Sequence, residues 1–249
     1  MRTIAFAFIL GCLVAVPALG QETYTLKRVF KEGTERKYAS RAVILPAQGE
    51  EYRLVVERED VEKCVKVTPE GNAQLESREL KLTMKFNDME LPNPSEEPGM
   101  DKMLVTPRND ILKMETSNTE DDMGLRLGRA IQVVYPDKPV AIGQAWKHEP
   151  KADEKGGLRG GTADIKLLAI ETVNGVRCAK LEHKYVEKPF RADKGKVEAE
   201  LTVWVDLANG ELVKIIGKVT GMVVDMGGDT ELRMDFTGEY VPSKTAGAI

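Results

Sequence analysis

The feature that most constrains this chain is a period-two alternation of apolar and polar residues. Within residues 73–91, apolar side chains occupy alternate positions at Leu80, Leu82, Met84 and Phe86. Glu79, Lys81 and Lys85 occupy positions of the opposite set. An extended chain places successive side chains on opposite faces, so the pattern predicts a half-buried antiparallel strand.

Similar segments recur along the chain and are separated by short turn signals. Asn174-Gly175 and Asn209-Gly210 are hairpin dipeptides, because both residue types tolerate positive φ. The expected strands are 23–30, 35–45, 51–59, 61–68, 73–91, 144–149, 162–172, 176–186, 197–207, 211–224 and 230–241, with two short ones near 102–106 and 110–115. Residues 31–34 are expected to join the first two strands as a hairpin. The pattern predicts about a dozen strands.

One helix is expected in the middle of the chain. Its apolar stripe comprises Met123, Leu127, Ala130, Ile131 and Val134. Ser117 or Thr119 can cap it, residues 120–122 are acidic, and Pro136 ends it. Gly124 and Gly128 weaken it by about 1 kcal/mol each relative to alanine, so packing must hold it in place.

The first twenty residues have the three parts of an export signal. Arg2 precedes an apolar run from Ile4 to Val16, and small residues follow Pro17. We expect cleavage between Gly20 and Gln21, a single β-rich domain over 21–241 and a flexible tail over 242–249. The run is too short for a membrane span, which needs about 20 apolar residues. Ile9-Leu10-Gly11-Cys12 also resembles a bacterial lipobox, so lipidation at Cys12 is an alternative.

Charge and composition exclude several classes of function. Hydrophobic residues make up 42% of the chain and charged residues 31%, as in a soluble globular protein. The net charge of −4 becomes −5 when Arg2 is removed with the signal. A weakly acidic domain has no electrostatic footprint for nucleic acid. We therefore expect no nucleic-acid partner, and no transmembrane segment after signal removal.

Cys64 and Cys178 would remain in a chain exported to an oxidising compartment. If Val61, Val65 and Val67 point inward, Cys64 lies with Glu62 and Lys66 on the polar outer face of its strand. Cys178 likewise alternates with Ala179 and Leu181 and falls on the face of the charged residues. A disulfide between them is therefore possible, and it would stabilise the fold by about 4–5 kcal/mol.

No residue pattern indicates catalysis. His183 shares a face with Leu181 and Tyr185 and is interpreted as a core histidine, while His148 lies two residues after Trp146 in a short strand and is also given a packing role. Neither has a second ligand at the spacing of a zinc site, and no serine stands in a nucleophile context. We expect no enzyme activity, no metal and no cofactor.

Methionine is the one compositional oddity, since nine methionines remain after signal removal. Flexible thioethers suit an irregular cavity that accepts varied apolar ligands, although ordinary filling of a core predicts them too and is the favoured interpretation. The sequence alone leaves both interpretations open.

The segment from Pro136 to Trp146 resembles a signature of secreted bacterial β-proteins of unknown function, in which valine, glycine and tryptophan are each separated by two residues after a central helix. The opening from Tyr24 through Gly33 to Tyr38 is similar to the first hairpin of those proteins. They in turn resemble the half-open β-barrels of lipoprotein carriers and periplasmic lipid-binding proteins. The resemblance implies no catalytic residue.

The expected fold is mainly β, a single strongly curved antiparallel sheet or half-open barrel with one central α-helix. The expected function is that of an exported, periplasmic or secreted, non-enzymatic protein that binds an apolar or lipid-like ligand in the concave face of the sheet. The alternative is a structural or interaction protein of the bacterial cell envelope, with a protein partner and no small-molecule ligand.

Overall fold

The computed structural model describes residues 22–49, 52–92, 99–115, 122–152, 159–188, 195–225 and 229–242. The expected export signal with Cys12, the helix cap at Ser117 or Thr119 and residues 243–249 of the tail lie outside these residues. Within the described residues, no helix is long and apolar enough to cross a membrane.

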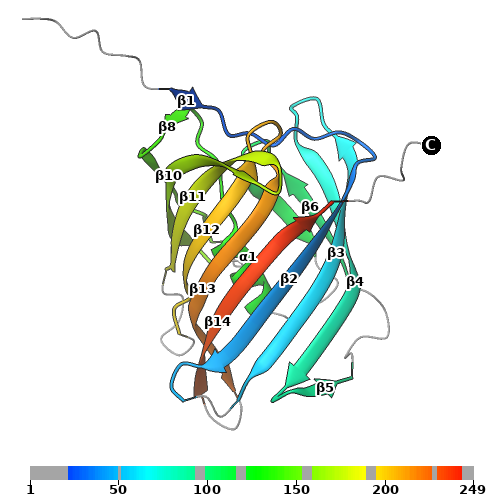
Figure 1. Ribbon diagram of the computed structural model, residues 1–249, viewed down its shortest axis with the longest axis vertical. Coiled ribbons are helices and arrows are strands. Elements are labelled where there is room, and N and C mark those ends of the chain that lie inside the picture. Colours follow the sequence, from blue (N-terminus) through cyan, green and yellow to red (C-terminus); the bar gives the residue numbers. More distant parts are fainter. Residues whose placement is uncertain are drawn as a thin grey trace, which may run out of the picture.

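The described chain is dominated by one antiparallel sheet of twelve strands (Figure 1). Its strand order is β7-β6-β4-β3-β2-β14-β13-β12-β11-β10-β9, with β5 paired to β4. The bounds are β2 Glu35–Pro46, β3 Leu54–Val67, β4 Ala73–Phe86, β5 Met89–Leu91, β6 Met100–Val105, β7 Ile111–Glu115, β9 Ala145–His148, β10 Gly161–Val173, β11 Val176–Glu187, β12 Glu198–Asp206, β13 Leu212–Asp225 and β14 Asp229–Val241. Because β7 and β9 do not pair with each other, the sheet stays open, as predicted for a half-open barrel.

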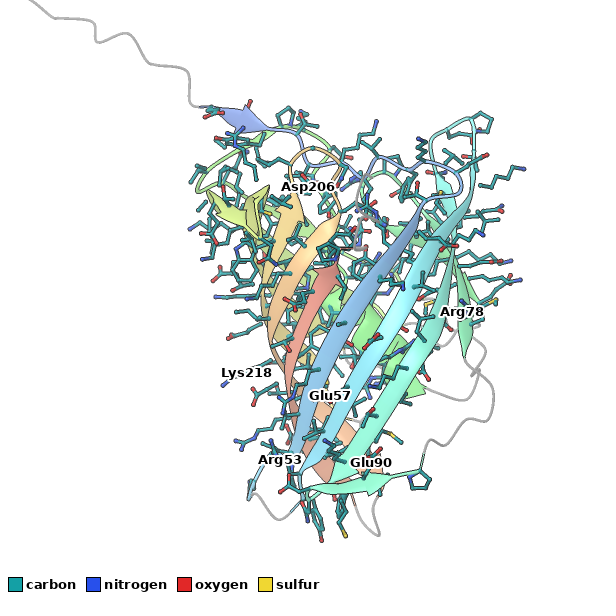
Figure 2. The ribbon with its side chains drawn as sticks, turned by 45° about the vertical axis from the view of Figure 1, so that its right-hand side comes forward. Arg53, Glu57, Arg78, Glu90, Asp206 and Lys218 are labelled. Atoms are coloured by element: carbon teal, nitrogen blue, oxygen red, sulfur yellow. The ribbon has the colours of Figure 1, made fainter. Side chains whose placement is uncertain are left out.

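The sheet curves around the single helix of the described residues, α1 (Asp122–Ile131) (Figure 1). α1 packs against β11, β12 and β13. The apolar core lies on this concave face and includes Ile165, Leu181, Leu201 and Ile215. The opposite, outer face carries charged side chains such as Glu57 and Lys218 (Figure 2). The alternation of polar and apolar residues thus gives the sheet a solvent-exposed outer face and an apolar inner face that packs against the helix.

The prediction that residues 23–30 and 35–45 form a hairpin is wrong. Only Thr23–Tyr24 forms a strand, β1, and it pairs with β8 (Val140–Ala141) in a separate two-stranded sheet. The following residues cross one end of the barrel, where Arg28 N donates to Pro107 O at 2.7 Å and Val29 N donates to Asn209 O at 2.8 Å. Leu26 and Arg28 alternate in burial as strand residues would, but they are buried by this crossing.

Residues 132–135, which we call the closing segment, connect the two edges of the sheet. Tyr135 N donates to Arg108 O at 2.7 Å, and Asn109 Nδ2 donates to Val133 O at 2.9 Å, both in the turn before β7. On the other side, Trp146 Nε1 of β9 donates to Val134 O at 2.9 Å. The helix therefore ends before Val134, which the apolar stripe had assigned to it.

The predicted disulfide between Cys64 and Cys178 does not form, and both residues are free, buried thiols. Their strands, β3 and β11, are separated in the sheet by β2, β14, β13 and β12. Cys64 packs in a cluster with Ala73, Leu75 and Val105, whereas Cys178 packs with Trp204 and Val213. Burial raises the pKa of both thiols.

The expected polar surroundings of the two cysteines are also wrong, for different reasons. Cys178 does alternate with Ala179 and Leu181, but Trp204 and Val213 make that part of the outer face apolar. Cys64 lies on the same face of β3 as Glu62, and Glu62 faces the interior. The valines suggested the opposite assignment because β3 carries charged residues on its inner face.

Candidate functional site

The main candidate site is a cavity of about 530 Å³ between α1 and the concave face of the sheet, which we call the main chamber. Helix α1 contributes Gly124, Leu127, Gly128 and Ile131 to one wall. The strands contribute the charged Arg58, Asp60 and Glu239, together with apolar residues from both ends of the chain: Ala42, Val56, Val203, Val205, Leu212, Ile215, Met234 and Phe236. Its volume lies within the range of about 300–1,000 Å³ that is typical of ligand pockets.

The curvature of the sheet leaves this chamber unfilled. Helix α1 contacts β11, β12 and β13, and the facing inner surface of β2, β3 and β14 has no second helix among the described residues. Small residues widen the space, since Ala42 and Gly238 line it from neighbouring strands. The concave face therefore has a cavity in its middle, whereas core side chains cover it along β10, β11 and β12.

One end of the main chamber is closed by a buried ion-pair network centred on Arg28. Its Nη2 donates to Glu62 Oε1 at 2.6 Å and to Glu211 Oε2 at 2.8 Å. Arg36 Nε lies 3.4 Å from Glu211 Oε1 and supplies a second positive charge, so that the network has one arginine for each glutamate. Two arginines and two glutamates thus neutralise one another where the N-terminal segment crosses the barrel.

Burial and charge set the protonation of this network. Burial disfavours the cationic form of Arg28, but Glu62 and Glu211 outweigh that effect and raise its pKa. Burial raises the pKa of the Glu211 carboxyl, and the two arginines oppose the shift. Burial and the nearby carboxylates also raise the pKa of Tyr38, whose hydroxyl lies 3.5 Å from Glu211 Oε2. The network is therefore ionic at its centre and holds a neutral phenol beside it.

A second cavity of about 250 Å³, the side chamber, adjoins the main chamber. Both chambers are lined by Arg28, Glu62, Asn109, Gly128 and Gln132. The other described residues of its wall are mainly apolar, and Arg129 is the one further charged residue among them: Met103, Val105, Ile111, Met114, Leu125 and Arg129.

Gly128 is a wall residue shared by the two chambers, and there is free space beside it. A Cβ added to Gly128 would have no heavy atom within 4 Å. The sequence shows Gly128 only as a weak point of the helix. Its placement gives it a second consequence, because any larger side chain there would extend into the space beside the chambers.

The two histidines are not brought into either chamber. His183 is completely buried and its Nε2 donates to Ala130 O at 2.9 Å, near the end of α1, in agreement with a core role. His148 Nε2 lies 3.9 Å from Asp110 Oδ1, beyond hydrogen-bonding distance. Burial lowers the pKa of both imidazoles. Among the described residues, no group of three or more His, Cys, Asp or Glu side chains could hold a metal ion.

The methionines divide between the two interpretations that the sequence left open. Met234 lines the main chamber, and Met103 and Met114 line the side chamber. Met222 is buried in the core, whereas Met89 and Met100 are exposed. Three methionines are thus positioned for ligand contact.

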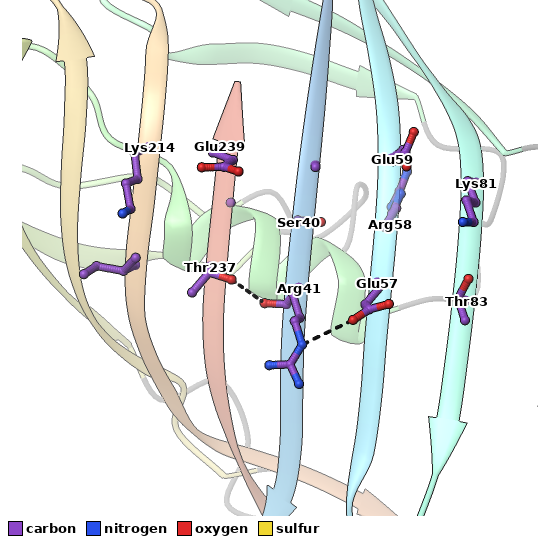
Figure 3. Close-up of a pocket in the computed structure, with 13 residues that line it drawn as sticks. Ser40, Arg41, Glu57, Arg58, Glu59, Lys81, Thr83, Lys214, Thr237 and Glu239 are labelled. Carbon is purple, nitrogen blue, oxygen red and sulfur yellow. Dashed lines mark hydrogen bonds and ion pairs between the residues drawn. The ribbon is translucent and has the colours of Figure 1, made fainter. Parts of the chain in front are cut away.

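The outer face has its own depression of about 410 Å³, drawn in Figure 3. Helix α1 lies behind the strands in this view, so the depression is on the side away from the chambers (Figure 3). Its walls are charged and include one exposed ion pair, in which Arg41 Nε lies 3.3 Å from Glu57 Oε1 and both side chains are about half exposed. An exposed pair of this kind contributes little to stability.

Sequence reasoning missed Arg28, Glu62 and Glu211. Arg28 was assigned to a strand, and Glu62 was assigned to the outer face. Glu62 and Glu211 follow Arg28 by 34 and 183 residues in the chain, so no local sequence pattern connects the three. The one available signal was the charged residues at alternate positions of β3, Arg58, Asp60 and Glu62, which also line the main chamber.

Comparisons with known proteins do not assign this chain to a family. No protein-family model matches the chain, and no curated protein matches it. Among solved structures, the chain is similar to a LolA superfamily protein from Nitrosomonas europaea, with 10% sequence identity, 89% of this chain and 90% of that chain covered, and a TM-score of 0.24. At that TM-score the similarity carries no argument, so the fold and the site rest on the strand pairing and the chambers described above.

Proposed function

We propose that this chain is an exported, non-enzymatic binding protein that holds an apolar or amphipathic ligand in the main chamber. The observation that carries the proposal is the cavity of about 530 Å³ on the concave face, lined by aliphatic and aromatic side chains and closed at one end by a neutralised ion network. Burial of an apolar ligand surface there would supply the binding free energy, and polar groups at one end would orient the ligand.

Two substitutions on neighbouring residues of β2 test the proposal. Ala42→Trp places an indole in the main chamber, whereas Val43→Trp places the same group in the outer face, because successive residues of a strand point to opposite sides. We expect the uncharged fluorophore Nile red to bind the unchanged protein and Val43→Trp, and to bind Ala42→Trp at least tenfold more weakly. Equal binding by all three proteins would contradict the proposal.

A second measurement addresses the natural ligand. Native mass spectrometry of the protein purified without detergent should show an adduct of lipid mass, and the adduct should be lost in Ala42→Trp. An unloaded protein that also fails to bind Nile red, but crosslinks to a stable envelope protein, would favour the alternative role as an interaction protein.

Export is part of the same proposal and rests on the signal pattern of residues 1–20. Expression of the full chain in a Gram-negative host, followed by mass measurement of the N-terminal peptide, should give Gln21 as the first residue. A lipid-modified peptide beginning at Cys12 would instead identify the lipobox alternative.

A further inference from the structure

Three arginines line the two chambers, and they differ in their partners. Arg28 is held by Glu62 and Glu211, and Arg58 Nε lies 2.7 Å from Asp60 Oδ1. Arg129 has no hydrogen bond or ion pair to any residue in the described part of the chain, and its Nε is shielded from solvent. A guanidinium that is partly withdrawn from water normally has an acidic partner.

The surroundings of Arg129 do not supply such a partner. It lines the side chamber among Met103, Ile111, Met114 and Leu125, and the other charges there are the mutually paired Arg28 and Glu62. Among the described residues that line the side chamber, the charges therefore sum to one positive charge, because Glu62 and Arg28 cancel. An anion is the ligand that would complete this chamber.

We propose that the side chamber binds the acidic head group of an anionic amphiphile, a carboxylate or a phosphate, through Arg129, while the apolar chain of the same molecule occupies the main chamber. This rests on the proposed function and names its ligand class. A guanidinium forms paired, charge-assisted hydrogen bonds with either acid.

The two chambers share a wall across which one molecule can extend. Gly128 lines both, and no heavy atom lies within 4 Å of the position that its Cβ would take. Arg129 follows Gly128 directly in the helix, so the charge lies beside this shared wall. The chamber of about 250 Å³ is less than half the size of the main chamber, which suits a head group against a longer chain.

A set of probes with one chain length tests the head group separately from the chain. Palmitate, hexadecanol and hexadecylamine carry negative, neutral and positive heads, and their displacement of Nile red from the unchanged protein can be compared. We expect palmitate to bind about tenfold more tightly than hexadecanol, and hexadecylamine to bind most weakly. Monohexadecyl phosphate distinguishes phosphate from carboxylate, and sodium acetate, which has no chain, should displace nothing at millimolar concentration.

Variants of Arg129 assign the effect to one side chain. Arg129→Gln should reduce palmitate affinity about tenfold and leave hexadecanol affinity unchanged, since the loss concerns a charge-assisted bond. Arg129→Lys, which keeps the charge, should recover part of the affinity. Arg177→Gln, which removes an arginine that is 65% exposed on β11, should change neither. Thermal unfolding of each variant shows that it is folded.

The outcomes separate this inference from the proposed function. If all three probes bind equally and Arg129→Gln changes none of them, the head-group site is wrong while the apolar chamber stands. Preference for hexadecylamine, or displacement by acetate alone, would also overturn it. If no probe and no Nile red binds, the proposed function itself fails.

Discussion

Arg28 Nη2 and Glu211 Oε2 lie 2.8 Å apart although 183 residues separate them in the chain. This contact joins the N-terminal crossing segment to the start of β13 and closes one end of the main chamber. Because the pair is buried, its worth depends on both partners being present. Removal of one partner leaves a charge without compensation in the interior.

Arg28→Met should therefore destabilise the fold by about 3–5 kcal/mol, because Glu62 and Glu211 lose their shared partner. Urea unfolding followed by tryptophan fluorescence measures the change. The control is Arg53→Met, whose partner Asp88 is 89% exposed and whose loss should have little effect. An equal decrease in the free energy of unfolding for both variants would show that the buried network stabilises the fold no more than an exposed ion pair does.

Gly128→Ala should stabilise the protein by up to about 1 kcal/mol. Alanine is the better helix former, and its methyl group would meet no neighbouring atom. The midpoint of urea unfolding should rise. Gly210→Ala provides the opposite case, because Gly210 has φ +68° and an added Cβ would clash with the backbone of Lys27. A loss of stability in Gly128→Ala would show that the helix moves toward that space.

His183 should make stability fall with acidification. Burial lowers its pKa below the ordinary histidine value of about 6.5, so below that pH the unfolded chain takes up a proton that the folded chain does not. The free energy of unfolding is thus greatest above this pH and declines as the pH falls below it, until the buried imidazole also becomes protonated.

The difference between the unchanged protein and His183→Gln isolates this contribution, since the carboxylates are common to both. Glutamine can still donate to Ala130 O, which now accepts from His183 Nε2 at 2.9 Å. We expect a smaller decline in stability between pH 7 and 5 for His183→Gln. Parallel curves for the two proteins would show that His183 does not titrate on unfolding.

Cys64 and Cys178 should react slowly with a thiol reagent in the folded protein and rapidly after denaturation. Both are buried, and burial raises the pKa of each thiol and so reduces the reactive thiolate. Ellman's reagent applied to the chain beginning at Gln21 should count two thiols in urea without a reductant. A count of zero that rises on reduction would restore the disulfide predicted from the sequence.

The parts of the fold that local pattern determines could be predicted from the sequence. The expected strand 176–186 is β11, Val176–Glu187, because Ala179, Leu181 and Tyr185 alternate with charged residues and all three are buried. The turn at Asn174-Gly175 has the expected positive φ at both residues. In each case the residues that determine the structure are close together in the sequence. The apolar face of the strand is buried because its exposure to water is unfavourable.

The ion network and the closing segment could not be predicted, because their determinants are distant in sequence. Glu62 is polar and was assigned to solvent, and only the folded chain brings Arg28 to it from 34 residues away. Val134 continues the apolar spacing of α1, yet its carbonyl accepts from Trp146 in an extended segment. Periodicity indicates which side of a helix or strand is apolar. It does not indicate which charged residues from distant parts of the chain form ion pairs.

The closing segment determines how the barrel can deform. It ties the turn before β7 to β9 near one end of the gap between the sheet's edges, through Tyr135, Asn109 and Trp146. No strand pairing holds β7 to β9 elsewhere in the described residues. The open seam can therefore widen by a change in sheet twist alone, with the tied end as a hinge, and no hydrogen bond between strands needs to break.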